Sequence, residues 1–430
     1  MTLILMSLVV ISSANAVNIP PVPKDYSFAS DYAKLFNPST LKEISKAQEA
    51  AYVRLAPGDP APWFQQKTST NPLYSFSTVA GRYIVLLFFG SANNDYARAA
   101  IEAVNARAAL FNDAHASFFG VSNDPADLSE KRISDRIPGR RFFWDFNGHV
   151  ARLYGALPKE APRDSGPQVL RRRWVILDPS LRVLSIIETR ADGADIKAAL
   201  DFVAALPHPD RHAGCETPAP IIVLPRVFEP SFCKRMIDFY EASGGEESGF
   251  MREEGGKTVA AYDDAHKKRK DCLIRDQELV AEIQRRIMRR VAPEIQKVHQ
   301  FRVTRMERYV VGCYSSEDGG HFRPHRDNTT KGTAHRRFAL SVLLNDDYEG
   351  GEISFPEYGS RGYKPAAGGA VVFSCSLLHK VEKVTAGRRF VFVPFLYDDE
   401  AARQREANNA FLSDEVGAYE RKESKPDSAS

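Results

Sequence analysis

The chain lacks the features that define several large protein classes. It has only five cysteines, an odd number with no CxxC pair, which argues against a disulfide scaffold and against a structural zinc site. Its net charge is only +3 over 430 residues, which argues against a dedicated nucleic-acid-binding protein. No apolar run reaches the roughly 20 residues that a membrane-spanning helix requires. A composition of 43% hydrophobic and 26% charged residues is instead typical of a globular protein, here long enough for about two or three domains.

The start of the chain is apolar but forms an incomplete export signal. A run from Leu3 to Ile11 precedes an Ala-Asn-Ala sequence at 14–16, but no Lys or Arg comes before the run. Small residues at this distance are typical of a signal-peptide cleavage site, whereas the missing basic residues are not. Export and an unstructured start both stay open for residues 1–16, and we assign residues 1–49 as a signal-like or flexible segment.

Residues 50–207 show the alternation of strands and helices that is typical of an α/β domain. The run Tyr83–Phe89 is apolar without interruption, as expected for a strand covered on both faces. A helix is predicted over 96–111 and a second buried strand over 117–122, which together make a β-α-β unit. Three more elements follow: strands over 174–178 and 182–187 and a helix over 195–206.

A proline-rich segment separates this half from the next. Residues 207–220 contain four prolines and no apolar periodicity, so we assign 208–220 as a linker. The second domain is placed at 221–400, and a polar tail that we expect to fray at 401–430. Several elements are predicted after the linker: a strand over 221–224, helices over 230–242 and 277–290, the second capped by Asp276, and an antiparallel β-rich barrel or sandwich over 301–397.

One short motif in the β-rich part has the spacing of a metal site. His325 and Asp327 are two residues apart, and on a strand such residues point to the same face. His379 lies further along the chain. Two histidines and one carboxylate bind one side of Fe(II) and leave positions free for a co-substrate and O2. The H-x-D spacing alone is weak evidence, because it occurs often by chance.

An arginine after the second histidine strengthens this interpretation. Alternation puts Arg389 and Val391 on one face of a strand, which we expect to lie beside the strand of His379 after a turn at 384–387. A buried guanidinium needs an anionic partner, and a dianionic ligand held by a bidentate fork would supply it. Arg388 is the alternative anchor, although the alternation favours Arg389.

These residues resemble the Fe(II)/2-oxoglutarate-dependent dioxygenases of the prolyl 4-hydroxylase type. Four residues match the family's H-x-D…H…R/K pattern: His325, Asp327, His379 and Arg389. The resemblance covers about 221–397 and includes a Gly-Gly-Glu turn at 350–352, although residues 315–321 add an insertion before H-x-D. It implies a double-stranded β-helix (jelly-roll) with flanking helices. It also implies iron bound by the first three residues, and 2-oxoglutarate held by Arg389 and Tyr309.

The resemblance also implies an activity. Such enzymes consume 2-oxoglutarate and O2, release succinate and CO2, and hydroxylate a substrate, here most simply a peptidyl proline in a protein or peptide, with ascorbate as reductant. We expect no nucleic-acid partner and no membrane span. Because iron and 2-oxoglutarate are cytosolic resources, we expect a cytoplasmic protein, or an exported one if residues 1–16 are a signal peptide. The alternatives are a cupin-like metal-binding module without oxygenase activity and a thioredoxin-like redox adaptor.

The first half has a resemblance of its own. Leu55–Pro62 followed by the strand over 83–89 is similar to the opening of a peroxiredoxin, which has a thioredoxin-like fold. In that family the loop after the strand carries the peroxidatic cysteine, but here Gly90–Tyr96 has none, and no cysteine occurs before Cys215. Since a peroxidase requires its thiolate, the resemblance implies the fold without the activity.

Some further residues are given ordinary structural roles. His321 and His335 are expected on the surface, because neither has the spacing of a ligand. The basic runs Lys267–Lys270 and Arg171–Arg173 are expected to be solvated faces rather than nucleic-acid contacts.

Overall fold

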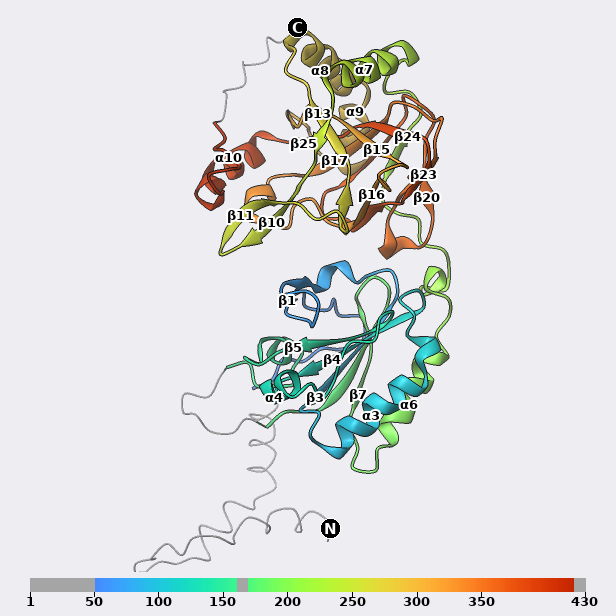
Figure 1. The fold of residues 1–430 in the computed structure, drawn as a ribbon, viewed down its shortest axis with the longest axis vertical. Coiled ribbons are helices and arrows are strands. Elements are labelled where there is room, and N and C mark those ends of the chain that lie inside the picture. The colour runs from blue at the N-terminus through green and yellow to red at the C-terminus, as the bar shows by residue number, and fades with distance from the viewer. Residues whose placement is uncertain (1–50, 161–168, 421–430) are drawn as a thin grey trace, which may run out of the picture. The chain divides into compact units, whose positions relative to one another are not determined.

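The computed structural model describes residues 51–160 and 169–420 (Figure 1). The predicted signal-like segment at 1–49 lies outside the described residues, as does the end of the predicted tail at 421–430. None of the helices in the described ranges is both long and apolar enough to cross a membrane.

The first half is built on one mixed sheet with the strand order β5-β4-β3-β6-β7. The central strand β3 (Tyr83–Gly90) pairs in parallel with β4 (Ala116–Ser122) and antiparallel with β6 (Arg173–Leu177). Helix α3 (Asp95–Ala106) connects β3 to β4, which confirms the predicted β-α-β unit. The outer strands are β7 (Val183–Glu188), which was predicted, and β5 (Arg140–Trp144), which was not.

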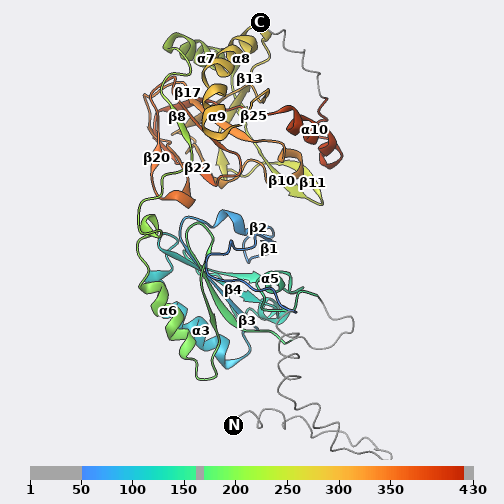
Figure 2. The same ribbon diagram turned by 180° about the vertical axis from the view of Figure 1, so that it is seen from behind.

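The uninterrupted apolar run of β3 is explained by two cores, one on each face of this sheet. Ile84, Leu86 and Phe88 belong to one buried cluster. Val85 and Leu87 belong to the other, which α3 and α6 (Ala194–Ala204) cover side by side (Figure 2). Because neither face contacts water, successive side chains are all apolar rather than alternating. This arrangement is the predicted thioredoxin-like fold.

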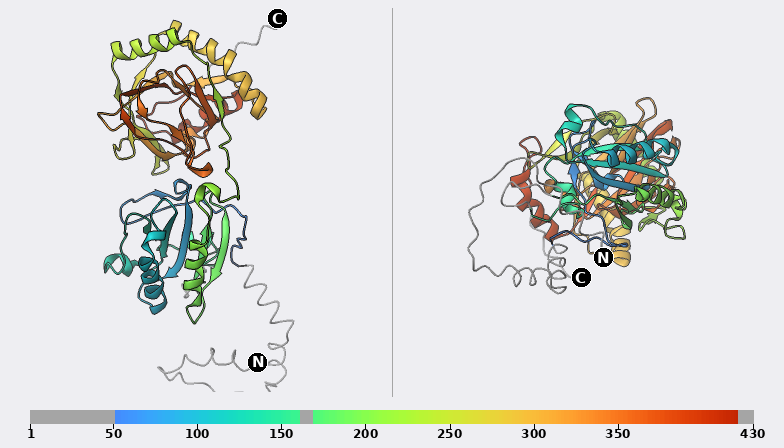
Figure 3. Two further views of the ribbon diagram at one scale, coloured as in Figure 1. Left: turned by 90° about the vertical axis from the view of Figure 1, so that its right-hand side faces the viewer. Right: turned by 90° about the horizontal axis from the view of Figure 1, so that it is seen from below.

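The two largest sheets of the second half together form a double-stranded β-helix (Figure 3). The larger sheet follows the order β14-β25-β17-β24-β15-β13-β9; β21 pairs with β17, and β8 pairs with β21. The smaller sheet follows the order β12-β16-β22-β19-β20. Six of these strands complete the sheets around the site: β8 (Ile222–Leu224), β9 (Glu246–Glu247), β19 (Ile353–Ser354), β20 (Gly362–Tyr363), β21 (Ala370–Ser374) and β25 (Phe395–Tyr397). The strands that the site uses are β12 (Lys267–Lys268), β13 (Lys270–Leu273), β14 (Arg305–Glu307), β15 (Val310–Ser315), β16 (His321–His325), β17 (Phe338–Leu343), β22 (His379–Val381) and β24 (Arg388–Phe392).

Three helices cover the outer face of the larger sheet: α7 (Pro230–Ser243), α8 (Gln277–Arg290) and α9 (Ala292–His299). The predicted cap of α8 is confirmed, since the Asp276 carboxylate accepts the Leu279 N–H at 2.7 Å. Phe390 and Phe392 of β24 pack in the same cluster as these helices. The alternate residues of β24 therefore face the other way, into the space between the two sheets.

The end of the described chain differs from the prediction of a frayed tail. Helix α10 (Asp399–Ala407) follows the last strand, and its Arg405 pairs with the buried Glu307 at 2.8 Å. The prediction missed this contact because it relied on apolar periodicity. An ion pair between one arginine and a buried carboxylate produces no such periodicity. Each described sheet takes its strands from one side of the segment 208–220 only, while the exact domain boundaries stay a prediction.

Candidate metal centre

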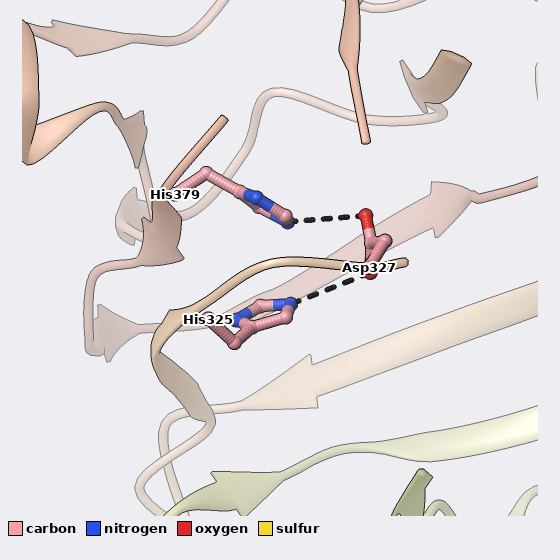
Figure 4. A group of neighbouring side chains, drawn as sticks. All are labelled: His325, Asp327 and His379. Atoms are coloured by element: carbon pink, nitrogen blue, oxygen red, sulfur yellow. Dashed lines mark ion pairs between the residues drawn. The ribbon is translucent and has the colours of Figure 1, made fainter. Parts of the chain in front are cut away.

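The H-x-D motif and the second histidine meet across two paired strands. His325 ends β16 and stands directly opposite His379, the first residue of β22. Asp327 follows two residues later, and its carboxylate points between the two imidazole rings (Figure 4). One ligand atom from each of the three residues can be chosen so that all lie within 4.8 Å of one another, which is the grouping that a bound cation requires.

The two imidazole rings present the same nitrogen to the carboxylate. The Nε2 atoms of His325 and His379 lie 3.7 and 3.4 Å from the carboxylate oxygens of Asp327. Their Nδ1 atoms lie 2.8 and 3.0 Å from the carbonyl oxygens of Arg323 and Leu377. A carbonyl can only accept, so each Nδ1 carries the proton and each Nε2 keeps a free lone pair. Backbone acceptors of this kind fix the tautomer of metal-binding histidines.

The surroundings keep His325 in the neutral form that binds metals. Its ring stacks on Phe322 at a centroid distance of 3.4 Å and lies 4.2 Å from the ring of His379. Burial, followed by the neighbouring His379, holds the pKa of His325 well below its usual range. A neutral imidazole offers the lone pair that a cation needs.

Arg389 lines the same narrow cavity, of about 60 Å³, as the three candidate ligands. The predicted alternation is observed: Arg389 is 1% exposed, whereas the exposed Arg388 pairs with Glu241 at 2.7 Å on the other face. The predicted pairing of the His379 and Arg389 strands is wrong, because β22 belongs to the smaller sheet and β24 to the larger one. The chain crosses between facing sheets here, which local alternation cannot reveal.

Arg389 has far fewer partners than a buried guanidinium normally requires. Its Nη2 donates to the Ser341 hydroxyl at 3.2 Å, and its group lies 5.0 Å from the centre of the Tyr314 ring. Its Nε is buried without an acceptor, and among the described residues no carboxylate pairs with it. The hydroxyl of the buried Tyr348 is a second neutral neighbour of this guanidinium. An unpaired cation of this kind is costly, so the cavity fits an anionic ligand.

The Gly-Gly turn lies directly against this arginine. Gly350 and Gly351 have φ values of +70° and +69°, a conformation that glycine adopts far more readily than other residues. A Cβ atom on Gly351 would stand 3.0 Å from Cδ of Arg389. The turn therefore lets the backbone pass close to the guanidinium.

The structure places a different tyrosine in the cavity from the one that the sequence suggested. The Tyr309 hydroxyl accepts a hydrogen bond from Gln284 of α8 at 2.6 Å, and its ring packs with the helices on the outer face. Tyr314 lines the cavity and stands opposite Arg389 in the pairing of β15 with β24. A role for Tyr309 in holding 2-oxoglutarate therefore lacks geometric support, and Tyr314 occupies the suitable position.

Half of one basic run is buried, contrary to expectation. Lys267 and Arg269 are 4% and 6% exposed, because the run 267–270 lies on β12 and β13 with alternate side chains turned inward. Arg269 makes a bidentate pair with Asp271 at 2.6 and 2.7 Å and lies 3.3 Å from the Tyr314 hydroxyl. The run is uniformly basic, so its own pattern gave no signal of which side chains turn inward.

His335 is also buried rather than on the surface. It is 1% exposed, and its Nε2 lies 3.1 Å from the Glu307 carboxylate. Arg336 pairs with the same carboxylate at 2.7 Å, so Glu307 draws partners from several segments that only the folded chain brings together. His321 is partly buried, and its ring bonds to the carbonyl oxygen of Gly319.

In the first half, the loop after β3 holds a carboxylate rather than a thiol. The Ala92 N–H donates to Asp127 at 2.8 Å, and Asp127 is fully buried. Ser122 and Arg132 also bond to Asp127, at 2.7 and 3.3 Å. The region therefore offers a satisfied structural carboxylate and no nucleophilic sulfur.

Comparison with known families matches each half separately. Residues 308–397 match the family model of the 2OG-Fe(II) oxygenase superfamily, and residues 57–185 match that of the AhpC/TSA family. A PKHD-type hydroxylase of Stutzerimonas stutzeri (strain A1501) is 31% identical over 160 residues, which are 34% of this chain and 70% of that protein.

Two solved structures are similar at low sequence identity. A prolyl hydroxylase from Trichoplax adhaerens, in complex with a peptide fragment of a hypoxia inducible factor, is 16% identical with a TM-score of 0.34, over 43% of this chain and 86% of that one. Peroxidoxin BcpB from Mycobacterium tuberculosis is 22% identical with a TM-score of 0.31, over 36% of this chain and 99% of that one.

Proposed function

The chain belongs to the PKHD-type hydroxylases of the 2OG-Fe(II) oxygenase superfamily, and we propose that it hydroxylates a peptidyl proline with Fe(II), 2-oxoglutarate and O2. One observation carries the proposal: Arg389, a buried guanidinium for which residues 51–160 and 169–420 supply no acidic partner, shares a cavity with two histidines and an aspartate. A metal alone would not require such a group. A dianion that reaches the metal with one end and the guanidinium with the other would.

The residues of the cavity divide into two sets of roles. His325, Asp327 and His379 would hold Fe(II), and Arg389 with Ser341 would receive the distal carboxylate of 2-oxoglutarate. When bound, the iron supplies the oxidative decarboxylation of 2-oxoglutarate to succinate and CO2 and the transfer of one oxygen atom to the substrate. The chain binds and orients these groups and keeps competing reactions out.

The protein's own contribution begins with fixed ligand geometry. The backbone acceptors of Arg323 and Leu377 hold both rings with Nε2 turned inward. Tyr314 forms the wall beside Arg389 and is itself held by Arg269. Because these side chains bond to the fold before any ligand enters, little ordering remains to be done on binding.

The two alternatives are less well supported. A cupin-like metal module without oxygenase activity has no need for an unpaired buried arginine. A redox adaptor would need a thiol, and residues 50–207 contain no cysteine. Ascorbate as reductant, a protein or peptide as substrate and a cytoplasmic location all belong to the proposal.

The test is a turnover assay with the full chain. We expect Fe(II)-dependent conversion of 2-oxoglutarate to succinate, and oxygen incorporation into proline-containing peptides detected by mass spectrometry. Turnover that persists after iron is removed by a chelator would contradict the proposed metal, and the absence of any 2-oxoglutarate turnover would contradict the proposed reaction.

A further inference from the structure

A second group of cations lies in the wall of the same cavity, apart from Arg389. Arg269 and Arg308 line the cavity together with His325 and Asp327. Both arginines bond to one carboxylate, that of Asp271. Two guanidinium groups therefore share a single negative charge, which leaves one positive charge without a counterpart.

The two arginines differ in how fully they are used. Arg269 is bidentate on Asp271 and also lies within hydrogen-bonding distance of Tyr314. Arg308 makes one hydrogen bond to that carboxylate, from Nη2 at 3.0 Å, and its Nε and Nη1 have no acceptor within the described part of the chain. Its side chain is 31% exposed. Arg308 is thus the cation whose Nε and Nη1 can donate to a further ligand.

Other charged groups nearby do not supply the missing negative charge. Glu307 is already paired with Arg336, Arg405 and His335, and Asp327 belongs to the candidate metal centre. Lys267 adds a buried amino group that donates to a hydroxyl and a carbonyl, at 2.6 Å each, rather than to a carboxylate. Even without Lys267, the two arginines and the one carboxylate of Asp271 leave an excess of one positive charge.

The backbone at Arg308 is unusual as well. Its φ is +64°, in the left-handed region that residues with a side chain rarely occupy. The strain of such a residue is typical of sites where a side chain has a task in binding. Here the turn directs Arg308 into the cavity, between β14 and β15.

We propose that Arg308 binds an acidic side chain of the substrate, so that the target residue lies in a peptide segment with a nearby aspartate or glutamate. The inference rests on the proposed function, since it concerns the substrate that the metal centre would hydroxylate. A carboxylate of the substrate would accept hydrogen bonds from Nε and Nη1 of Arg308. It would also neutralise the one positive charge that Asp271 does not compensate. A charge-assisted pair of this kind is favoured in a partly buried wall, where water screens it less than at an open surface.

The experiment uses the full chain loaded with Fe(II) and 2-oxoglutarate and a synthetic peptide library. Each peptide carries a fixed proline with two varied positions on either side, and products are identified by the mass of one added oxygen atom. We expect aspartate and glutamate to be enriched about 10- to 100-fold over asparagine and glutamine at one or more positions, the range of a hydrogen bond to a charged group. The measured quantity is the ratio of oxygenated peptides that carry an acid to those that carry the matching amide at the same position. A change in overall activity affects both kinds of peptide equally and does not alter this ratio.

Two variants make the test specific. In Arg308→Glu the acid-to-amide ratio should fall below that of the wild type by at least about tenfold, and lysine should become enriched at the same position. In Arg388→Glu, which makes the same change on the outer face of the sheet, the ratio should stay as in the wild type. If Arg308 only supported Asp271, Arg308→Glu would lower all products alike, and the unchanged ratio would overturn the proposal.

The outcomes also separate this inference from the proposed function. Oxygenated peptides without an acidic preference would overturn the inference alone. Turnover of 2-oxoglutarate without any oxygenated peptide would overturn both the inference and the assignment of a peptidyl proline. No turnover of 2-oxoglutarate at all would contradict the reaction itself.

Discussion

One buried charge in the second half of the chain differs from the buried carboxylates of the first half in how far the protein satisfies it. In the first half, Asp127 and Asp195 are fully buried, and each is bonded by several groups of the protein. In the second half, Arg389 is as deeply buried, but among the described residues it has only neutral partners and its Nε has no acceptor. A buried charge that the chain satisfies holds a fold together. One that the chain leaves unsatisfied, next to candidate metal ligands, indicates a ligand.

The largest expected effect compares one carboxylate from each half. Asp327→Ala removes a candidate iron ligand, so 2-oxoglutarate turnover should fall by more than the roughly 10- to 100-fold that follows loss of an outer partner of a metal. Asp127→Ala should instead lower the free energy of unfolding by about 1–3 kcal/mol, because the buried Ala92 N–H loses its acceptor and the Ser122 hydroxyl loses its shortest hydrogen bond. Succinate formation per folded molecule and urea unfolding measure the two effects.

As a control, the unfolding of Asp327→Ala and the turnover of Asp127→Ala are measured as well. Asp327→Ala should unfold at nearly the wild-type urea concentration, and Asp127→Ala should keep its turnover per folded molecule. Iron-dependent turnover in Asp327→Ala would mean that the metal ligands lie elsewhere.

The second prediction separates neighbouring arginines of β24. Arg389→Ala should raise the Michaelis constant for 2-oxoglutarate by about 30-fold to several thousand-fold, the cost of roughly 2–5 kcal/mol for losing a buried charged contact. Iron affinity should change little. Arg388→Ala, whose partner Glu241 lies on the outer face, should leave the Michaelis constant near the wild-type value. If Arg388→Ala raised the Michaelis constant for 2-oxoglutarate and Arg389→Ala did not, Arg388 would be the residue that anchors 2-oxoglutarate.

The third prediction concerns a carboxylate of the first half whose effect is on stability alone. Burial raises the pKa of Asp113, but hydrogen bonds from Arg141 and Ser117 outweigh it and bring the pKa to about 2. The folded value lies below the unfolded one, near 3.8, so the stabilisation is present above that pH and is lost as the pH falls toward 2.

Asp113→Asn should therefore cost about 2 kcal/mol at neutral pH, and the difference from wild type should shrink toward zero in acid. Urea unfolding of both proteins at a series of pH values measures it. A difference that grows as the pH falls would contradict the sign of this shift.

The smallest effect is an expected absence of activity in the first half. The full chain should consume no peroxide with a thiol reductant, because no cysteine lies in residues 50–207 and Asp127 already accepts the Ala92 N–H in the loop after β3. Peroxide loss is compared with a sample whose cysteines have been alkylated. Thiol-dependent consumption that persists after alkylation would break the contrast between the halves, because every cysteine of the chain lies at or beyond Cys215.

Local patterns predicted the parts of the structure that depend on neighbours in sequence. The apolar run of β3, the Asp276 cap and the i, i+2 spacing of His325 and Asp327 each involve only a few consecutive residues. The inward direction of Arg389 followed from alternation within one strand, and it is observed. These features needed no knowledge of which strands pair.

The residues that were missed depend on how distant strands meet. Arg269 and Tyr314 reach the cavity because β13 and β24 both pair with β15, which no local pattern reveals. Tyr309 was assigned to the cavity by resemblance, but Arg308 at φ +64° interrupts the extended chain just before it. The side-chain direction of residues before Arg308 therefore says nothing about Tyr309. Counted forward instead, Tyr309 lies two residues before Val311 and shares its face toward the helices.

Because the described residues give Arg389 no acidic partner, the amount of folded protein should depend on the concentration of a dianionic ligand. A dianion that binds only the folded state adds RT ln(1 + [L]/Kd) to its stability, about 2.7 kcal/mol when its concentration is 100 times Kd. The chain without ligand carries the uncompensated charge in its interior and should unfold and be degraded more readily. The lifetime of this protein in a cell should therefore follow the concentration of the dianion that we propose for this cavity.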